Sequence, residues 1–150
     1  MITVGVDGYI TALEADELIS SCHKDSLAEN WLTLSTEDKE AYIRSATYRI
    51  DCLPIGGFKH SAKQQLQFPR GMSSDIPHIV KLATAEEALS ATDEQLLKRI
   101  ALQQQGVESV TLGSASESYN GNAIIKNTPL LSQTAYNYMQ QYIVGSVRIK

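Results

Sequence analysis

The residues able to carry chemistry are scattered along this 150-residue chain. Its three histidines, His23, His60 and His78, lie far apart, and no two have the spacing that places metal ligands on one helix face. Glu86 and Glu87 are adjacent rather than one turn apart, so we interpret them as solvated helix surface. The sequence also lacks a glycine-rich phosphate loop and a serine nucleophile elbow. We therefore expect no catalytic, metal or cofactor site, and no enzyme activity.

A different chemistry is suggested by the segment 54–74, in which helical periodicity is lost. It interleaves cations with aromatic rings, the pattern of a single-strand nucleic-acid platform, where rings stack on bases and cations follow phosphates. The residues concerned are Phe58, Lys59, His60, Lys63, Phe68 and Arg70. The alternative is an ordered loop whose rings anchor to the core and whose cations face water. The net charge of −4 argues against a general nucleic-acid coat.

Two helices are predicted before this segment, over residues 12–22 and 36–52. The first follows Thr11, which has an acidic residue three positions further on, the spacing of a capping box. The second follows Ser35 and carries acidic residues in its first turn, where the helix dipole favours them. Trp31 lies in the connector between the two helices. We expect this large ring to close one end of the helical core.

Three further helices are predicted after the segment, over residues 76–90, 93–105 and 129–143. Pro77 suits the first turn of the earliest of these, because that position needs no N–H donor. Residues 107–119 instead alternate, with little apolar material to bury, and indicate a strand or hairpin that projects or pairs with a neighbouring chain. The predicted fold is a single, mainly α domain over the whole chain. It is a small bundle of four to five helices with a projecting β-hairpin or extended segment, a C-terminal helix and a tail.

Charge is unevenly distributed along the chain. Residues 1–53 hold ten acids and four bases, a net charge of −6, whereas residues 54–105 and 106–150 each have a net charge of +1. This asymmetry would suit head-to-side packing of identical subunits.

No apolar run approaches the roughly 20 residues that span a bilayer, and the first residues have no secretory-signal pattern, so we expect cytoplasmic synthesis and no membrane partner. Cys22 and Cys52 are interpreted as buried, reduced thiols.

The order of several short motifs resembles a known family, the head–tail connector (adaptor, or head-completion) proteins of tailed bacteriophages. Many members of that group carry the label DnaT-like single-stranded DNA-binding. The sequence differs from the pattern in having Phe68 where the family often has tryptophan, and in a longer, more polar segment over 90–105. The matching pieces are Gly8-Tyr9-Ile10-Thr11 with Glu14-Ala15-Asp16, Trp31 with Leu34-Ser35 and Asp38-Lys39-Glu40, Ala46-Thr47 with Ile50-Asp51, Gln64 to Arg70, and Ile76-Pro77 with Val80 and Ala83.

The resemblance implies a structural protein of the virion neck, at the head–tail interface, made in the host cytoplasm. About twelve identical subunits would form a ring between the portal protein and a stopper or tail-completion (tail-terminator) protein, with genomic DNA passing through the lumen without specific binding. The alternative is a single-stranded DNA-binding replication accessory protein. Candidate subunit or portal contacts are Arg70, Tyr119, Tyr138, Tyr142, Val147, Arg148, Ile149 and Lys150, and candidate structural anchors are Trp31, Phe68, Pro69, Ile76 and Pro77.

Overall fold

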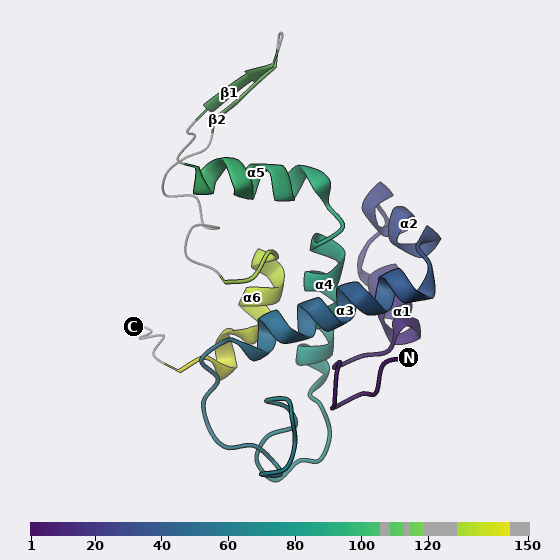
Figure 1. Ribbon diagram of the computed structural model, residues 1–150, viewed down its shortest axis with the longest axis vertical. Helices are drawn as coiled ribbons and strands as arrows, with labels where there is room; N and C mark the ends of the chain where they lie inside the picture. Colours follow the sequence, from purple (N-terminus) through teal and green to yellow (C-terminus); the bar gives the residue numbers. More distant parts are fainter. Residues whose placement is uncertain (106–108, 113–114, 119–128, 145–150) are drawn as a thin grey trace.

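The computed structural model describes residues 1–105, 109–112, 115–118 and 129–144. Within these residues it contains six α-helices, one 3-10 helix and a two-stranded antiparallel sheet, so the predicted mainly helical fold is confirmed. The elements appear in Figure 1, where α5 and the sheet lie toward one end of the long axis and the loop after α3 lies at the other.

The first three helices are α1 (Ala12–Cys22), α2 (Ser26–Thr33) and α3 (Thr36–Asp51). Each begins after a side chain that accepts a hydrogen bond from a first-turn backbone N–H, the arrangement that satisfies the otherwise unpaired donors of a helix start. Helix α2 occupies the stretch that was expected to be a connector. With eight residues it is too short to show a long apolar period, although Asp25 is a clear cap. The capping residues of the three helices are Thr11, Asp25 and Ser35.

Helix α4 (His78–Ser90) is the central element of the bundle, and it packs on α1, α2, α3 and α6. All its residues from Ala83 to Leu89 are buried, and the alanines among them let neighbouring helices approach closely. One core cluster joins this helix to α1, α2 and α3 around Trp31, and a second joins it to α6 and the loop around Phe68. The helix begins two residues later than predicted, because Pro77 takes the N-cap position.

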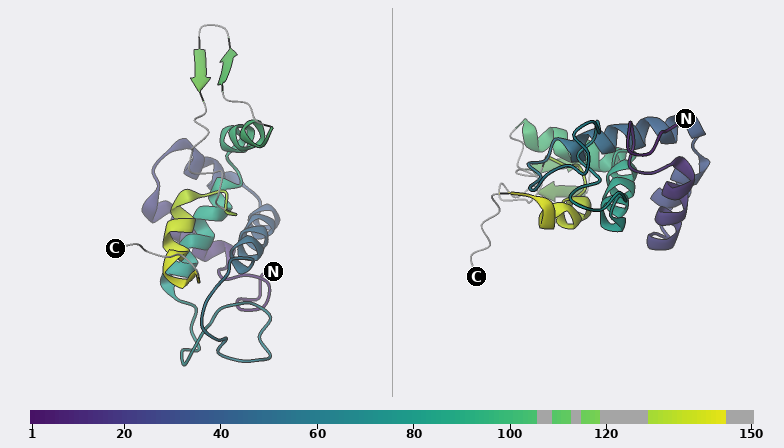
Figure 2. Two further views of the ribbon diagram at one scale, coloured as in Figure 1. Left: turned by 90° about the vertical axis from the view of Figure 1, so that its left-hand side faces the viewer. Right: turned by 90° about the horizontal axis from the view of Figure 1, so that it is seen from below.

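The remaining elements are α5 (Glu94–Gln104), β1 (Ser109–Leu112), β2 (Ala115–Ser118), α6 (Gln133–Met139) and the 3-10 helix η2 (Gln140–Tyr142). The two strands pair with each other in antiparallel register and stand beyond α5, away from the other helices (Figures 1 and 2). The last α-helix begins after Ser132 rather than at 129, because that serine supplies the cap, its Oγ accepting from the N–H of Ala135 at 3.1 Å.

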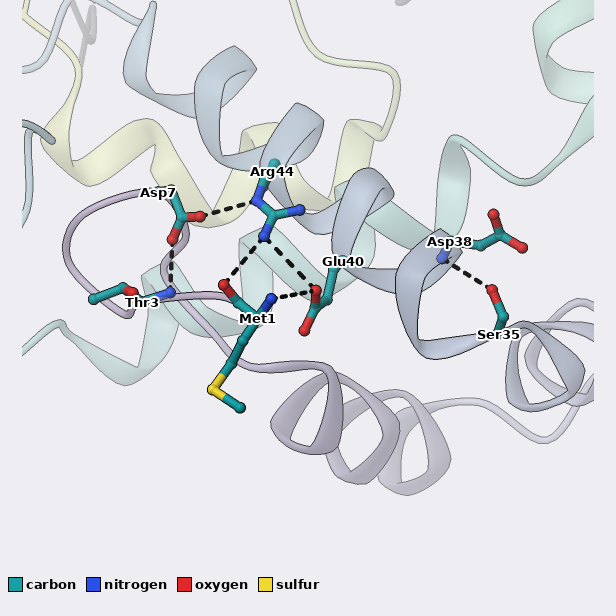
Figure 3. Close-up of polar contacts among 7 residues, drawn as sticks. All are labelled: Met1, Thr3, Asp7, Ser35, Asp38, Glu40 and Arg44. Carbon is teal, nitrogen blue, oxygen red and sulfur yellow. Dashed lines mark hydrogen bonds and ion pairs between the residues drawn. The ribbon is translucent and has the colours of Figure 1, made fainter.

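The N-terminal residues fold back onto α3 through a set of ionic contacts (Figure 3). The amino group of Met1 lies 3.1 Å from Glu40 Oε2, and Arg44 donates to Asp7 at 2.9 Å and to the carbonyl of Met1 at 3.2 Å. Asp7 also accepts from the backbone N–H of Thr3 at 2.7 Å. The hydrogen bond from Arg44 is the main reason that the pKa of Asp7 is lowered.

Two expectations about polarity were wrong. Glu86 and Glu87 are buried, not solvated: Glu87 has 0% exposure, and Glu86 lies 2.7 Å from Nε2 of His23. Their helix lies in the centre of the bundle, so no side of this turn faces water. Cys22 and Cys52 were expected to be buried, but both are free thiols on the surface. They lie at the last turns of α1 and α3, where the helices leave the core.

Candidate nucleic-acid interface

Residues 52–74, which we call the basic loop, connect α3 to the segment that leads into α4. They contain three residues that are always cationic, Lys59, Lys63 and Arg70, together with His60 and no Asp or Glu. In a chain of net charge −4, this stretch of 23 residues has three positive charges and no acid, a local charge of +3. Such a stretch favours contact with an anionic partner.

The base of the basic loop is closed by a short antiparallel pairing with the chain after α6. Gly56 N–H donates to the carbonyl of Tyr142 at 2.8 Å, and Val144 N–H donates to the carbonyl of Pro54 at 2.8 Å. A Cβ atom at Gly56 would lie 2.4 Å from Cγ2 of Val144, so any larger residue at this position would force the Val144 side chain to move. The loop is therefore held by the C-terminal part of the protein.

A second pairing closes the loop further out. His60 N–H donates to the carbonyl of Pro69 at 3.1 Å, and Gly71 N–H donates to the carbonyl of Phe58 at 3.0 Å. Inside this closure the side-chain amide of Gln64 donates to two backbone carbonyls, at 2.9 and 2.8 Å. These bonds satisfy backbone groups that would otherwise need water, and they give the loop a defined shape.

The inner side of the loop is anchored by Phe68, which is fully buried and precedes a cis proline. Its ring meets Tyr9 and Tyr142 edge-on, with ring centroids 5.8 and 4.9 Å apart. The Tyr9 hydroxyl donates to Asp51 and accepts from the Phe68 N–H at 3.3 Å, while Asp51 also accepts from the Gln67 N–H at 2.9 Å. Burial, reinforced by the neighbouring carboxylate, strongly raises the pKa of Tyr9, so the hydroxyl stays protonated and keeps donating.

The outer side of the loop presents a ring and cations to solvent. Phe58 is 68% exposed and Met72 is 93% exposed, and Lys63 and His60 are also exposed. Because Phe68 is buried, it cannot stack on a base, so Phe58 is the ring of the predicted platform that remains accessible. Arg70 is partly engaged, since its Nη1 donates to the carbonyl and to the side-chain oxygen of Gln67 at 3.1 and 2.8 Å.

The structure places the other candidate residues at several separate points. Trp31 is buried, with its indole N–H donating to Asp16 at 2.8 Å. Tyr138 and Tyr142 are half-buried in the second core cluster, and burial raises the pKa of Tyr142. Pro69, Ile76 and Pro77 are also half-buried, while Tyr119 and the tail Val147, Arg148, Ile149 and Lys150 lie outside the described residues.

Glu87 is a key residue that sequence reasoning missed. Its carboxylate accepts from Arg49 Nε at 2.6 Å and from the backbone N–H groups of Leu131 and Ser132 at 2.8 and 2.9 Å. It therefore joins α3 and α4 to the start of α6. The sequence of α4 holds one indication of the burial of Glu87, because most residues of this helix are apolar and few positions are left to face solvent. Among the described residues, no group of three or more His, Cys, Asp or Glu side chains could hold a metal ion.

Comparison with known proteins gives one family match. The family model described as "Putative DnaT-like ssDNA binding protein" matches residues 1–148, almost the whole chain. No curated protein and no solved structure matches the chain. No helix in the described part of the chain is long and apolar enough to cross a membrane. The comparisons give no support to a head–tail connector identity, and the family description names single-stranded DNA binding instead. The chain belongs to the family of DnaT-like ssDNA binding proteins.

Proposed function

We propose that the protein binds single-stranded DNA through the basic loop. The observation that carries the proposal is the joint presence of an accessible ring, Phe58, and three cations on one braced, acid-free loop. Rings stack on bases of any sequence and cations follow the backbone, which is the usual chemistry of such sites. The description of the family supports the same function.

The negative net charge is compatible with this site because most of the acids lie elsewhere, although Asp51 and the exposed Asp75 flank the loop. The exposed acids Glu17, Glu29 and Glu37 belong to α1, α2 and the first turn of α3. The basic loop leaves the other end of α3, and a helix of 16 residues is about 24 Å long. This distance exceeds the Debye length of about 8 Å at physiological salt, so the acids repel DNA at the loop only weakly.

The number of cations sets the expected salt dependence. For single strands the slope of log K against log salt is about −0.7 for each neutralised phosphate, so three contacts give a slope of about −2. Binding should then weaken about 20-fold between 50 and 200 mM salt. Stacking of one base on the Phe58 ring should contribute about 1–3 kcal/mol.

Fluorescence anisotropy with a labelled oligo-dT tests this function directly. The variant Phe58→Ala should weaken binding by at least about fivefold, and Lys63→Ala should reduce the salt slope by about 0.7. Lys98→Ala is the matched control, because Lys98 is an exposed lysine on α5 and lies outside the basic loop. Absence of binding at 50 mM salt would reject the function, and an equal loss in the control would reject the site.

A second candidate function is the neck adaptor ring, favoured by the structure around α5. This helix carries Leu96, Leu97 and Ile100, yet none of its residues is buried in the described structure. It leads into a two-stranded sheet with no third strand among the described residues, and such a sheet needs a partner for stability. The sheet and the basic loop lie at opposite ends of the long axis (Figure 1), as contacts to two different partners require.

In this second candidate, one end would bind the portal protein and the other a stopper or tail-completion protein, with identical subunits forming the ring. Electron microscopy of purified virions, or of co-assemblies with portal, tests it. Density for copies at the portal-proximal ring position is the expected result, and an empty position would reject the adaptor. Deleting residues 147–150 should weaken assembly while leaving the helical circular dichroism unchanged. Unchanged assembly would show that the tail has no part in it.

A further inference from the structure

The basic loop carries more exposed apolar surface than phosphate contacts require. Phe58 is 68% exposed and Met72 is 93% exposed, and both lie beside the Gly71–Phe58 pairing that closes the loop. A large ring and a long thioether held outward on a braced loop form a knob that a hollow could receive. Lys63 is also exposed on this loop, and no acid lies between Asp51 and Asp75.

A hollow of matching size lies elsewhere on the same molecule, between α1 and α2. Its volume is about 150 Å³, which is of the order of one aromatic side chain. Ala28 and Leu32 supply apolar lining, and Leu32 is among the exposed large hydrophobic residues. The hollow is lined by Ser20, His23, Lys24, Asp25, Ala28, Glu29 and Leu32.

The charges around the hollow are opposite to those of the basic loop. Asp25 and Glu29 line it, and the exposed Glu17 lies three residues before Ser20 on the same side of α1. The one lysine of the hollow, Lys24, donates to the carbonyl of Ser20 at 2.7 Å. Three acids against one lysine leave this surface with a net charge of −2, which complements the cations on the loop.

The knob and the hollow cannot meet within one molecule, because α2 and the basic loop lie at different ends of α3 (Figures 1 and 2). We infer that the basic loop of one copy docks into the α1–α2 hollow of a second copy, with Phe58 filling the hollow and Lys63 facing Glu17 and Glu29. This contact joins two different surfaces of the same chain. It is therefore heterologous, and repeating it gives a ring where the rotation closes and a filament where it does not.

The inference goes beyond DNA binding. It implies that the basic loop binds either single-stranded DNA or the hollow of a second copy, and not both at once. Phe58 cannot stack on a base while it occupies the hollow of a neighbour. Self-association should therefore compete with single-stranded DNA, and oligo-dT should dissociate the assembly. The acidic surface around the hollow of one copy would then compete with DNA for the basic loop of another copy.

Charge reversal on each side of the contact tests the inference with the full-length chain. One variant carries Lys59→Glu and Lys63→Glu, and the other carries Glu17→Lys and Glu29→Lys. Sedimentation velocity at 50 mM salt should show association of the wild type, weakened about 10-fold or more in each variant alone. An equal mixture of the two variants should associate again, because the unaltered loop of one meets the unaltered hollow of the other and the reversed surfaces also attract.

Circular dichroism confirms that each variant is folded before the comparison. A wild type that stays monomeric at high concentration, variants that associate like the wild type, or a mixture that fails to regain association would each overturn the inference. The DNA titration separates this result from the proposed function. Restored association in the mixture without any oligo-dT binding supports the docking contact and rejects DNA binding, and oligo-dT binding by a strictly monomeric protein does the reverse.

Discussion

Replacing Glu87 by alanine should be among the most damaging single changes in this protein. The side chain is fully buried and accepts three hydrogen bonds, one from Arg49 and two from the backbone N–H groups of Leu131 and Ser132. Ser132 in turn caps α6. One carboxylate therefore holds together α3, α4 and the beginning of the last helix, elements that lie far apart in the sequence.

The expected loss of stability follows from the groups that Glu87→Ala leaves without a partner. Removing one partner of a buried ion pair costs about 3–5 kcal/mol, because the other charge stays without compensation. Arg49 already has one buried nitrogen, Nη2, with no hydrogen-bond partner in the described structure. Its side chain is 26% exposed, however, so it can turn partly toward water, and we expect a loss of about 3 kcal/mol. Out of a total stability of about 5–15 kcal/mol this is a large fraction.

Urea unfolding followed by far-UV circular dichroism measures the loss. The matched control is Glu86→Ala, the adjacent residue on the same helix, which is 12% exposed and pairs with His23 alone. A double-mutant cycle with Arg49→Ala should give a coupling of about 1–3 kcal/mol for the pair. A loss below about 1 kcal/mol for Glu87→Ala, or a loss equal to that of the control, would refute the bridging role derived from the structure.

Three further changes have defined outcomes. Burial, together with the hydrogen bond to Asp51, raises the pKa of Tyr9 above the unfolded value of about 10. The stabilisation from Tyr9 is therefore present below pH 10 and is lost as the pH rises further. In the variant Tyr9→Phe, the free energy of unfolding measured with urea should change less between pH 9 and 11 than in the wild type. Gly56→Ala places a Cβ atom against Cγ2 of Val144; because that side chain is 61% exposed and can rotate away, the change should cost no more than about 1 kcal/mol in thermal unfolding. The lowered pKa of Asp7 gives stability that is present above about pH 4 and lost as the pH falls, so Asp7→Asn should cost less than about 1 kcal/mol at pH 7, and the cost should shrink as the pH is lowered below 4.

The helix starts could be predicted because their signals are local. Thr11 with Glu14 and Ser35 with Asp38 form hydrogen bonds within one turn, so the information lies within four residues of sequence. Helix α2 was missed, although Asp25 caps it in the same way. Eight residues give only two turns, and a periodicity test over a window of 11–18 residues cannot recognise so short a helix.

The buried polar groups could not be predicted, because they depend on which elements meet. A glutamate pair such as Glu86 and Glu87 normally indicates solvent, and only the packing of α1, α2, α3 and α6 around α4 makes it interior. The candidate site shows the same limit. Phe58 and Phe68 lie in the same segment without periodicity, so periodicity could not separate them; only the motif that contains Phe68 singled it out as a candidate anchor, and the structure has Phe68 fully buried and Phe58 exposed.

The position of the basic loop depends on segments from both halves of the chain. Tyr9 and Asp51 hold it from the N-terminal side, while Tyr142 and Val144 hold it from the C-terminal side. The exposed ring is therefore positioned before any partner arrives, which lowers the entropy cost of binding. If the loop binds as proposed, damage to the core on either side should weaken the binding by displacing Phe58, without any change to the residues of the loop itself.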